Sequence, residues 1–296
     1  MTASAMELEA NGQLTEEGVE AVSLTASSTR PGITAPVPAG TSATRCSRSI
    51  TVIFPAYNEE QNIRSAMARA LEAMRPRFHV FELLIIDDGS TDRTGEIAED
   101  LARTYPEITV IRHRQNLGLG ETLFRGFQYA RGELVIQNAM DYPFDLCDLD
   151  RMIPLLEEAD VIVATRTGYA GYTLYRKLAS RVNRFILRRL FNPELRDYNY
   201  TQLFRRDVLS LARPNSRSTV FMVPEIIIRA SELGFRMKEV AIDYHPRVFG
   251  QATSGKPKVI FRSLHDMFMF WIKRRLHIPD AVQGAVVYPQ TWQSEK

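Results

Sequence analysis

Residues 83–94 constrain the fold of this chain more than any other stretch. Residues 83–86 are four consecutive apolar side chains, two of them β-branched. A short apolar run of this kind, bounded by turn residues, is typical of a strand that is buried on both faces. We therefore expect a parallel sheet that is covered by helices on either side.

The end of this strand is acidic. Asp87 and Asp88 follow the apolar run, and residues 90–92 are polar side chains that can cap a helix over residues 93–105. In open α/β sheets, ligands bind at the carboxyl ends of the parallel strands. The two carboxylates are thus candidates for a ligand site, and a plain strand-to-helix turn is the alternative.

The same pattern recurs along the chain. Further strands are expected over residues 50–54, 108–111, 133–137 and 161–165. Together with the strand at 83–86, the strands up to residue 137 are expected to be separated by helices. Asn58 is expected to cap the helix after the first strand, with Glu59 and Glu60 in its first turn. Strands and helices that alternate at this spacing predict a parallel sheet with right-handed crossovers, whose polar strand ends line one edge.

Three motifs occur in a fixed order: residues 55–60 (PAYNEE), 87–92 (DDGSTD) and 116–120 (NLGLG). This ordered set, within residues 48–275, resembles family 2 glycosyltransferases, and among them the polyprenyl-phosphate glycosyltransferases such as dolichyl-phosphate mannose synthase. The resemblance implies the GT-A fold, which is a Rossmann-like α/β fold. Its mostly parallel sheet carries helices on both faces, here with amphipathic helices toward the C-terminus.

The resemblance also implies a donor site. In the family, the positions that match Pro55, Tyr57, Glu59, Ile86 and Asp88 hold the nucleotide of the sugar donor. A carboxylate can accept hydrogen bonds from base N–H groups or ribose hydroxyls, and a tyrosine ring offers a flat face. For Glu59 alone, a solvated acid is the alternative interpretation.

The family usually carries Asp-x-Asp at the next strand end, where it binds the Mg²⁺ or Mn²⁺ that bridges the donor diphosphate. Here Asn138, Ala139 and Met140 occupy these positions, and Asp141 follows. A thioether is a poor ligand for a hard cation. Three alternatives follow, in order of preference: a shifted metal site at Asp141, transfer without metal, or a site that no longer catalyses. Asn138 and Ala139 stay candidates for donor contact.

The resemblance assigns four further residues. Arg166, Arg247 and Lys256 correspond to basic residues that face the donor phosphates, although Lys256 lies about three residues beyond the family position. Asp197 is the candidate acid on the acceptor side, in a segment that lacks the glycine of the family. A bidentate guanidinium is well suited to a diphosphate, so Arg166 gains importance if no metal is present.

Two segments combine apolar residues at helical spacing with many basic ones: residues 172–191 and 256–276. Such a helix either packs on the core with a solvated face or lies at an anionic membrane surface. The second segment adds aromatic residues, and in the resembling enzymes helices at these places flank the lipid acceptor. We therefore expect peripheral membrane contact.

Composition divides the chain. Residues 1–46 are rich in small and polar residues, so we expect a disordered extension. A GT-A domain is expected over residues 47–255, an amphipathic helix over 256–278 and a tail over 279–296. The first 46 residues carry five acidic and two basic side chains, a net charge of −3, which leaves about +5 for the rest of a chain whose net charge is +2.

Localisation and partners are predicted from the same features. Cys46 and Cys147 form no disulfide framework, and the chain shows neither a signal peptide nor an apolar run of about 18 residues. We expect a cytoplasmic protein that contacts the membrane peripherally. Its partners would be a nucleotide sugar and a lipid phosphate. A nucleic-acid partner is not expected, because the basic residues follow helix faces beside large apolar ones.

The sequence thus predicts an inverting glycosyltransferase that moves a hexose from a nucleotide-diphosphate sugar, GDP-mannose or UDP-glucose, to a polyprenyl phosphate. An already anionic acceptor needs no strong general base, which fits a chain without an obvious catalytic His or Ser. Two alternatives remain: transfer to a hydroxyl of a small molecule or lipid, and a GT-A protein that binds nucleotide sugar without turnover.

Overall fold

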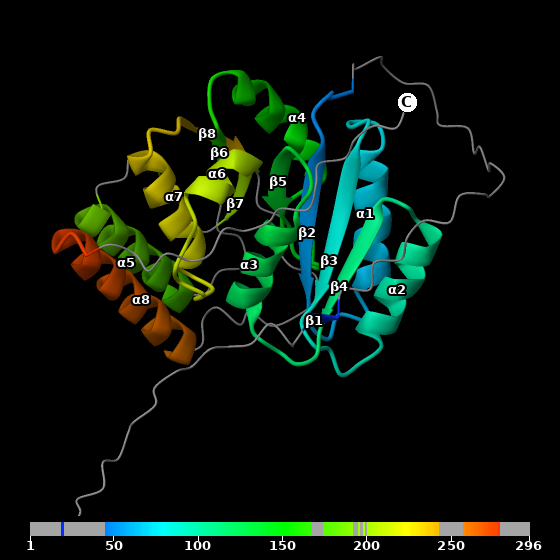
Figure 1. Ribbon diagram of the computed structural model, residues 1–296, viewed down its shortest axis with the longest axis horizontal. Helices are drawn as coiled ribbons and strands as arrows, with labels where there is room; N and C mark the ends of the chain where they lie inside the picture. The colour runs from blue at the N-terminus through cyan, green and yellow to red at the C-terminus, as the bar shows by residue number, and fades with distance from the viewer. Residues whose placement is uncertain are drawn as a thin grey trace, which may run out of the picture.

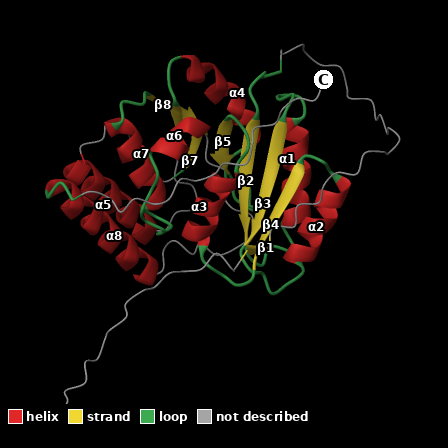
Figure 2. Cartoon of the chain, viewed as in Figure 1, coloured by secondary structure: helices red, strands yellow, loops and turns green. Residues whose placement is uncertain are grey.

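A computed structural model describes residues 19–20, 45–166, 174–191, 195, 198, 200–242 and 257–278. Within these residues eight strands form one sheet in the order β1-β4-β3-β2-β5-β7-β6-β8. The strands are β1 (Val19–Glu20), β2 (Ile50–Ala56), β3 (Phe81–Asp87), β4 (Ile108–His113), β5 (Leu134–Gln137), β6 (Val161–Arg166), β7 (Thr201–Arg205) and β8 (Met237–Ile242). The sheet is shown in Figures 1 and 2.

Six of the eight described strands, all but β1 and β7, run parallel to one another, as expected. The register is continuous across β2 and β3, where Ile50 lies opposite Phe81 and Ala56 opposite Asp87. β7 runs antiparallel between β5 and β6, and this insertion was not anticipated from the sequence. β7 falls in the segment for which only an acceptor-side loop was expected.

The edge strand β1 differs from the disorder expected for residues 1–46. It pairs antiparallel with β4, so that Val19 lies opposite His113 and Glu20 opposite Arg112. Residues 1–18 and 21–44 lie outside the described part of the chain, so the expectation remains untested for them.

Helices cover both faces of the sheet (Figure 1). Those described are α1 (Ile63–Met74), α2 (Thr94–Thr104), α3 (Leu119–Tyr129), α4 (Leu149–Met152), α5 (Leu174–Phe191), α6 (Arg206–Leu211), α7 (Met222–Glu232) and α8 (Pro257–Arg275), with short 3₁₀ turns at Leu146–Asp148 and Ile153–Glu157. The ranges expected for α2, α5 and α8 agree with these bounds to within about two residues at each end.

Alternate residues of each central strand enter opposite cores. Val52 and Phe54 pack with α1 and α2 on one face, whereas Ile53 packs with α3, α7 and α8 on the other. Leu83 and Leu84 divide between the two cores in the same way. These side chains are at most 1% exposed, which confirms the prediction of strands buried on both faces.

Candidate functional site at the carboxyl edge of the sheet

The turn after β3 is folded tightly against the segment that follows β4. Gly89 has a φ of +68°, in the left-handed region that favours glycine. A Cβ at this position would lie 2.4 Å from the carbonyl carbon of Gln115, so a side chain does not fit there. The backbone N–H of Ser90 donates to Asp87 Oδ1 at 3.0 Å, which closes the turn.

Asn58 does not cap α1, contrary to the expectation. The helix begins at Ile63, after an N-terminal Asn62 whose side chain makes no capping bond, so Glu59 and Glu60 precede the helix. Asn58 takes a φ of +55°, and its side chain turns toward the β3–α2 turn, where Oδ1 accepts from the N–H of Thr91 at 2.9 Å. Asn58 therefore joins two strand ends and does not start a helix.

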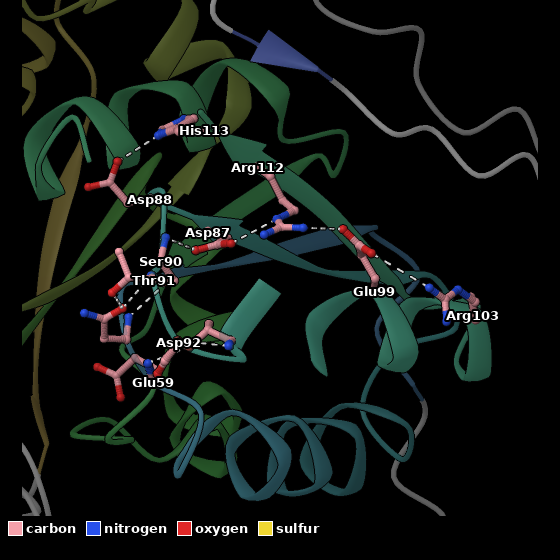
Figure 3. A network of polar contacts seen from close by, with 12 residues as sticks. Glu59, Asp87, Asp88, Ser90, Thr91, Asp92, Glu99, Arg103, Arg112 and His113 are labelled. Carbon is pink, nitrogen blue, oxygen red and sulfur yellow. Dashed lines mark hydrogen bonds and ion pairs between the residues drawn. The ribbon is translucent and has the colours of Figure 1, made fainter. Parts of the chain in front are cut away.

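The two turns are joined by further bonds (Figure 3). The N–H of Glu59 donates to Thr94 Oγ1 at 2.7 Å, and the N–H of Glu60 donates to Asp92 Oδ2 at 3.2 Å. Asp92 Oδ1 also accepts from the N–H of Thr94 at 2.9 Å, in the first turn of α2. Burial acts to raise the pKa of the Asp92 carboxyl. Its hydrogen bonds with Thr94 and Glu60 outweigh burial, so the pKa lies below the ordinary value.

The adjacent aspartates serve different partners. Asp87 is fully buried and forms an ion pair with Arg112, whose Nε lies 3.1 Å from Oδ2. Arg112 also contacts Glu99 at 2.8 Å. The hydrogen bond with Glu99 raises the pKa of Arg112; burial opposes this, and the charge of Asp87 adds to it. Asp87 thus fastens β3 to β4 and α2.

Asp88 organises the loop that leads into α3. Its Oδ1 accepts from His113 Nδ1 and from the N–H of Leu117, and its Oδ2 accepts from the N–H of Gly118, all at 2.8 Å. Figure 3 shows Asp88 beside His113. Asp88 is only 4% exposed. A carboxylate offers about four acceptor positions, so these three bonds within the described part of the chain use all but one of them.

His113 was not among the residues predicted for the site. It is the last residue of β4, and it reaches Asp88 because β3 and β4 are parallel and end at the same edge. Asp87 and Asp88 were selected because they stand at the carboxyl end of a parallel strand, and His113 stands at such an end as well. Its position at the end of β4 was the signal in the sequence that could have identified it.

The remaining donor-site candidates have distinct environments. Tyr57, the residue after β2, is 45% exposed. Glu59 is half-buried, and its carboxylate accepts from Asn62 Nδ2 at 2.6 Å. Pro55 lies opposite Ile86 in the sheet, and the Ile86 side chain is fully buried in the core with α3. Ile86 can therefore meet a nucleotide only through its backbone.

The turn after β5 packs its apolar side chains into the core. Asn138 Nδ2 donates to the carbonyl of Phe144 at 2.9 Å, and Oδ1 accepts from the N–H of Ala139. Met140 is 3% exposed and packs in the core with Tyr142 and Phe144. Burial raises the pKa of the Tyr142 hydroxyl well above its ordinary range.

These residues do not fit a metal centre that the protein builds by itself. Asn138 is engaged in two hydrogen bonds, Met140 points into the core, and Asp141 is the carboxylate that the turn offers. In the described part of the chain, no three His, Cys, Asp or Glu side chains gather in a way that could hold a metal ion. A hard cation prefers several oxygen ligands.

Arg166 ends β6 and stacks on an aromatic ring. Its guanidinium carbon lies 5.4 Å from the centre of the Tyr200 ring. The Tyr200 hydroxyl donates to the carbonyl of Pro143 at 2.9 Å, and its ring meets Phe144 edge-on. Tyr200 thus places Arg166 beside the turn that replaces the metal motif. Asp197, Arg247 and Lys256 lie outside the described residues.

Helices α5 and α8 lie side by side on one flank of the molecule (Figures 1 and 2), and Phe191 of α5 contacts Phe270 of α8 at 5.5 Å between ring centres. Both carry exposed apolar side chains, among them Phe185 at 68% and Phe261 at 74%. A surface cavity of about 400 Å³ is lined by Arg181, Arg184, Phe185 and Arg188. In the described part of the chain, no helix combines the length and hydropathy of a membrane span.

The chain is an open, mainly parallel α/β protein, a class in which ligands bind beyond the carboxyl ends of the strands. The profile described as Glycosyl transferase family 2 matches residues 51–211, which is more than half of the chain. The chain therefore belongs to glycosyl transferase family 2.

Two characterised relatives match most of this chain. An undecaprenyl-phosphate 4-deoxy-4-formamido-L-arabinose transferase of Pectobacterium atrosepticum is 28% identical over 217 residues, which are 72% of this chain and 64% of that protein. Glycosyltransferase AglD of Haloferax volcanii is 27% identical over 215 residues, 69% of this chain and 34% of that protein. The chain thus spans less than two thirds of the length of either relative.

Solved structures confirm the GT-A fold. Glucosyl-3-phosphoglycerate synthase of Mycobacterium tuberculosis, in complex with Mn²⁺, UDP and glucosyl-3-phosphoglycerate, superposes with a TM-score of 0.56 at 21% identity. The match covers 79% of this chain and 82% of that one. The same enzyme with Mg²⁺ and UDP gives a TM-score of 0.56 at 21% identity, covering 79% and 81% of the two chains.

Proposed function

We propose that this protein is an inverting glycosyltransferase that transfers a hexose from a nucleotide-diphosphate sugar to a polyprenyl-phosphate acceptor. One observation carries the proposal: a family 2 domain is flanked by two helices, α5 and α8, that expose large apolar and basic side chains together. A long-chain lipid phosphate presents both chemistries to a protein. The relative named as an undecaprenyl-phosphate 4-deoxy-4-formamido-L-arabinose transferase supports the acceptor class.

The donor nucleotide is assigned to the edge formed by β2, β3 and β4. The exposed ring of Tyr57 offers a face for the base, and Asp88 keeps one acceptor position for a base N–H or a ribose hydroxyl. Glu59 and the backbone of Ile86 complete this part of the site, together with Pro55. The base, guanine or uracil, is decided by these contacts.

The diphosphate is assigned to basic residues. Arg166 has a planar guanidinium that is backed by Tyr200, and this geometry suits bidentate contact with phosphate oxygens. Arg247 and Lys256 are proposed to join it. These groups would stabilise the negative charge that develops on the departing diphosphate, the role that a metal performs in many such enzymes.

The acceptor phosphate is already an anion near neutral pH, so the reaction needs no strong base to generate the nucleophile. A phosphate oxygen attacks C1 of the sugar, the C1–oxygen bond to the diphosphate breaks, and the configuration at C1 inverts. The protein contributes by holding the two reactants in line. Asp197 is proposed to contact the acceptor side.

A peripheral position on a membrane follows from the same helices. The exposed side chains of α5 and α8 include Val182, Phe185, Phe261, Leu264, Phe268 and Met269. Arginines at 181, 184 and 188 surround Phe185 on one face of α5. Apolar side chains that insert among acyl chains, beside arginines that meet lipid phosphates, are the pattern of an interfacial helix.

A second candidate function is nucleotide-sugar binding without turnover. It is favoured by the turn after β5, where Asn138 and Met140 serve the protein's own packing. The two functions, and transfer to a hydroxyl, are separated by one assay. Purified full-length protein would be incubated with GDP-mannose or UDP-glucose and either undecaprenyl phosphate or undecaprenol, with EDTA or Mn²⁺.

We expect glycosylated undecaprenyl phosphate and no product with undecaprenol. Product from undecaprenol would instead indicate transfer to hydroxyls. Binding of a nucleotide sugar without product from either acceptor would support the non-catalytic function. A useful control is Arg103→Ala, which removes an exposed arginine, 59% accessible in its side chain, from the last turn of α2. It should leave turnover unchanged, whereas Arg166→Ala should abolish most of it.

A further inference from the structure

The surface helix α8 carries one acid toward the protein interior. Asp266 is 22% exposed in its side chain, and its Oδ2 accepts a hydrogen bond from Ser216 Oγ at 2.7 Å. Ser216 is 8% exposed and belongs to the segment between α6 and α7. Figure 1 shows this segment passing between α8 and α3. The bond therefore fastens α8 to a buried loop.

That loop is held as a unit by buried polar groups. The N–H groups of Asn215 and Ser216 each donate to Glu225 at 2.9 Å, and Glu225 is 1% exposed at the start of α7. Ser216 Oγ accepts from the N–H of Ser218 at 3.0 Å. Arg229 lies 2.8 Å from the Glu225 carboxylate. Connected buried hydrogen bonds restrain a segment, so we expect the position of Ser216 to influence the whole loop.

The same loop touches the first turn of α3. The guanidinium of Arg217 lies 3.2 Å from the centre of the Phe124 ring, and its Nε lies 3.3 Å from Glu121 Oε2. A Cβ at Gly120 would lie only 1.8 Å from the carbonyl oxygen of Arg217, so the two backbones are in direct contact. Burial lowers the pKa of Arg217, and the charge of Glu121 opposes this.

The first turn of α3 continues into the donor edge. The N–H of Thr122 donates to the carbonyl of Gly118 at 3.1 Å. The N–H groups of Leu117 and Gly118 donate to Asp88. An uninterrupted set of contacts thus runs from Asp266 on the surface helix to the carboxylate of Asp88.

We propose that Asp266, Ser216 and Arg217 are positioning residues for the donor site. Asp266 on α8 holds Ser216 and Arg217, and these hold the first turn of α3 in place. The first turn of α3 in turn positions the loop whose N–H groups bond to Asp88. This inference rests on the proposed function in taking that edge as the donor site and the outer face of α8 as the lipid-facing surface. Because the outer face of α8 is the one that exposes Phe261 and Phe268, a lipid surface bound there is coupled to nucleotide affinity, and the coupling is reciprocal.

A chain of contacts does not by itself demonstrate energetic coupling between α8 and the donor edge, so the coupling is measured directly. The test uses the full chain and three variants. Asp266→Ala removes the acceptor for Ser216, and Asp266→Asn keeps an acceptor oxygen at the same place. Asp100→Ala is the matched control, since Asp100 is an exposed carboxylate on α2, 54% accessible and paired with Arg103.

The first readout is amide hydrogen exchange at residues 117–122 without nucleotide. We expect exchange there to be about three- to tenfold faster in Asp266→Ala, the loss of one hydrogen bond's worth of restraint. Asp266→Asn and Asp100→Ala should match the wild type. Equal exchange in Asp266→Ala and Asp100→Ala would overturn the proposal, and so would acceleration spread evenly over β2 and β3.

The second readout is the affinity for UDP and GDP, with and without vesicles of phosphatidylglycerol and phosphatidylcholine. We expect vesicles to change the affinity of the wild type, and to change that of Asp266→Ala much less. An equal vesicle effect in both proteins would overturn the coupling. If the wild type binds neither nucleotide, the proposed function fails, while the exchange readout still decides the positioning role. Should Asp266→Ala not fold, Ser216→Ala removes the same bond and carries the same expectations.

Discussion

The substitution Asp88→Ala removes the acceptor of one buried and two partly buried hydrogen bonds. His113 Nδ1 and the backbone N–H groups of Leu117 and Gly118 all donate to this carboxylate at 2.8 Å. The His113 side chain is fully buried, so water does not replace the lost acceptor without a rearrangement. The variant therefore tests whether Asp88 holds the loop before any ligand is bound.

The expected loss of stability can be worked out from these bonds. A buried donor without a partner costs about 1–3 kcal/mol. Loss of all three bonds would cost more than this if the loop kept its place. Leu117 and Gly118 are only half-buried, so relaxation of the loop exposes their N–H groups to solvent and lowers the total cost. We therefore expect Asp88→Ala to lower the free energy of unfolding by about 3–5 kcal/mol. Asp88→Asn, which keeps one acceptor oxygen, should lose about half as much.

Urea denaturation followed by fluorescence and circular dichroism measures this loss, with unchanged slopes as evidence of a two-state comparison. Asp100→Ala is again the control, and its exposed ion pair should contribute less than about 1 kcal/mol. If Asp88→Ala unfolds within about 1 kcal/mol of the wild type, the reasoning is refuted. Asp88 would then be a group kept for the ligand alone.

Three further predictions concern other parts of the site. Gly120→Ala places a Cβ against the Arg217 carbonyl, so it should lower stability by about 1–3 kcal/mol and weaken nucleotide binding; an unchanged melting temperature would contradict this. Met140→Asp, which restores one acid of the family motif, buries a carboxylate in the core and should destabilise the protein without creating Mn²⁺ binding, as calorimetry can show. The pKa of Asp92 is lower in the folded state than in the unfolded state, so its contribution to stability is present above the unfolded pKa and is lost as the pH falls through the folded pKa. The difference in unfolding free energy between Asp92→Asn and the wild type should therefore shrink from pH 6 to pH 3. A difference that stays constant would contradict this prediction.

Much of the fold could be predicted because its signals are local. The four strands from β2 to β5 are short apolar runs that end in turn residues, and burial on both faces makes that pattern unambiguous. β7 was missed because its place is set by its partners. Its residues pair with Leu134–Gln137 and Val161–Arg166, two strands far away in the sequence, and no local pattern shows an antiparallel insertion.

The location of the candidate site could be predicted from the sequence better than the hydrogen bonds within it. Carboxyl ends of parallel strands meet at one edge, so the residues that would gather there could be chosen from the sequence. Their partners depend on conformations that residue type does not specify. Asn58 adopts a left-handed φ and bonds to Thr91, so it does not cap a helix. Asp88 accepts from backbone N–H groups, which carry no signature in the sequence.

The turn after β5 shows the same limit. From the sequence, Met140 was a poor ligand in the place of a good one. The structure adds that its side chain belongs to the core, alongside Phe144. A variant that restores aspartate at positions 138 and 140 to test for lost metal binding would therefore also disrupt packing. Tests of metal dependence are better made on the native chain.

Calorimetric titration of the native chain with GDP-mannose and UDP-glucose, in EDTA and in Mg²⁺ or Mn²⁺, tests the proposed donor site most directly. We expect one of the two nucleotide sugars to bind, and we expect binding to persist in EDTA because basic residues hold the diphosphate. Tyr57→Ala and Arg166→Ala should each weaken it. Binding only in the presence of metal would contradict the assignment of the diphosphate and restore Asp141 as a ligand. Binding of neither nucleotide sugar under any of these conditions would contradict the central claim, that the carboxyl edge of this sheet is the donor site of a glycosyltransferase.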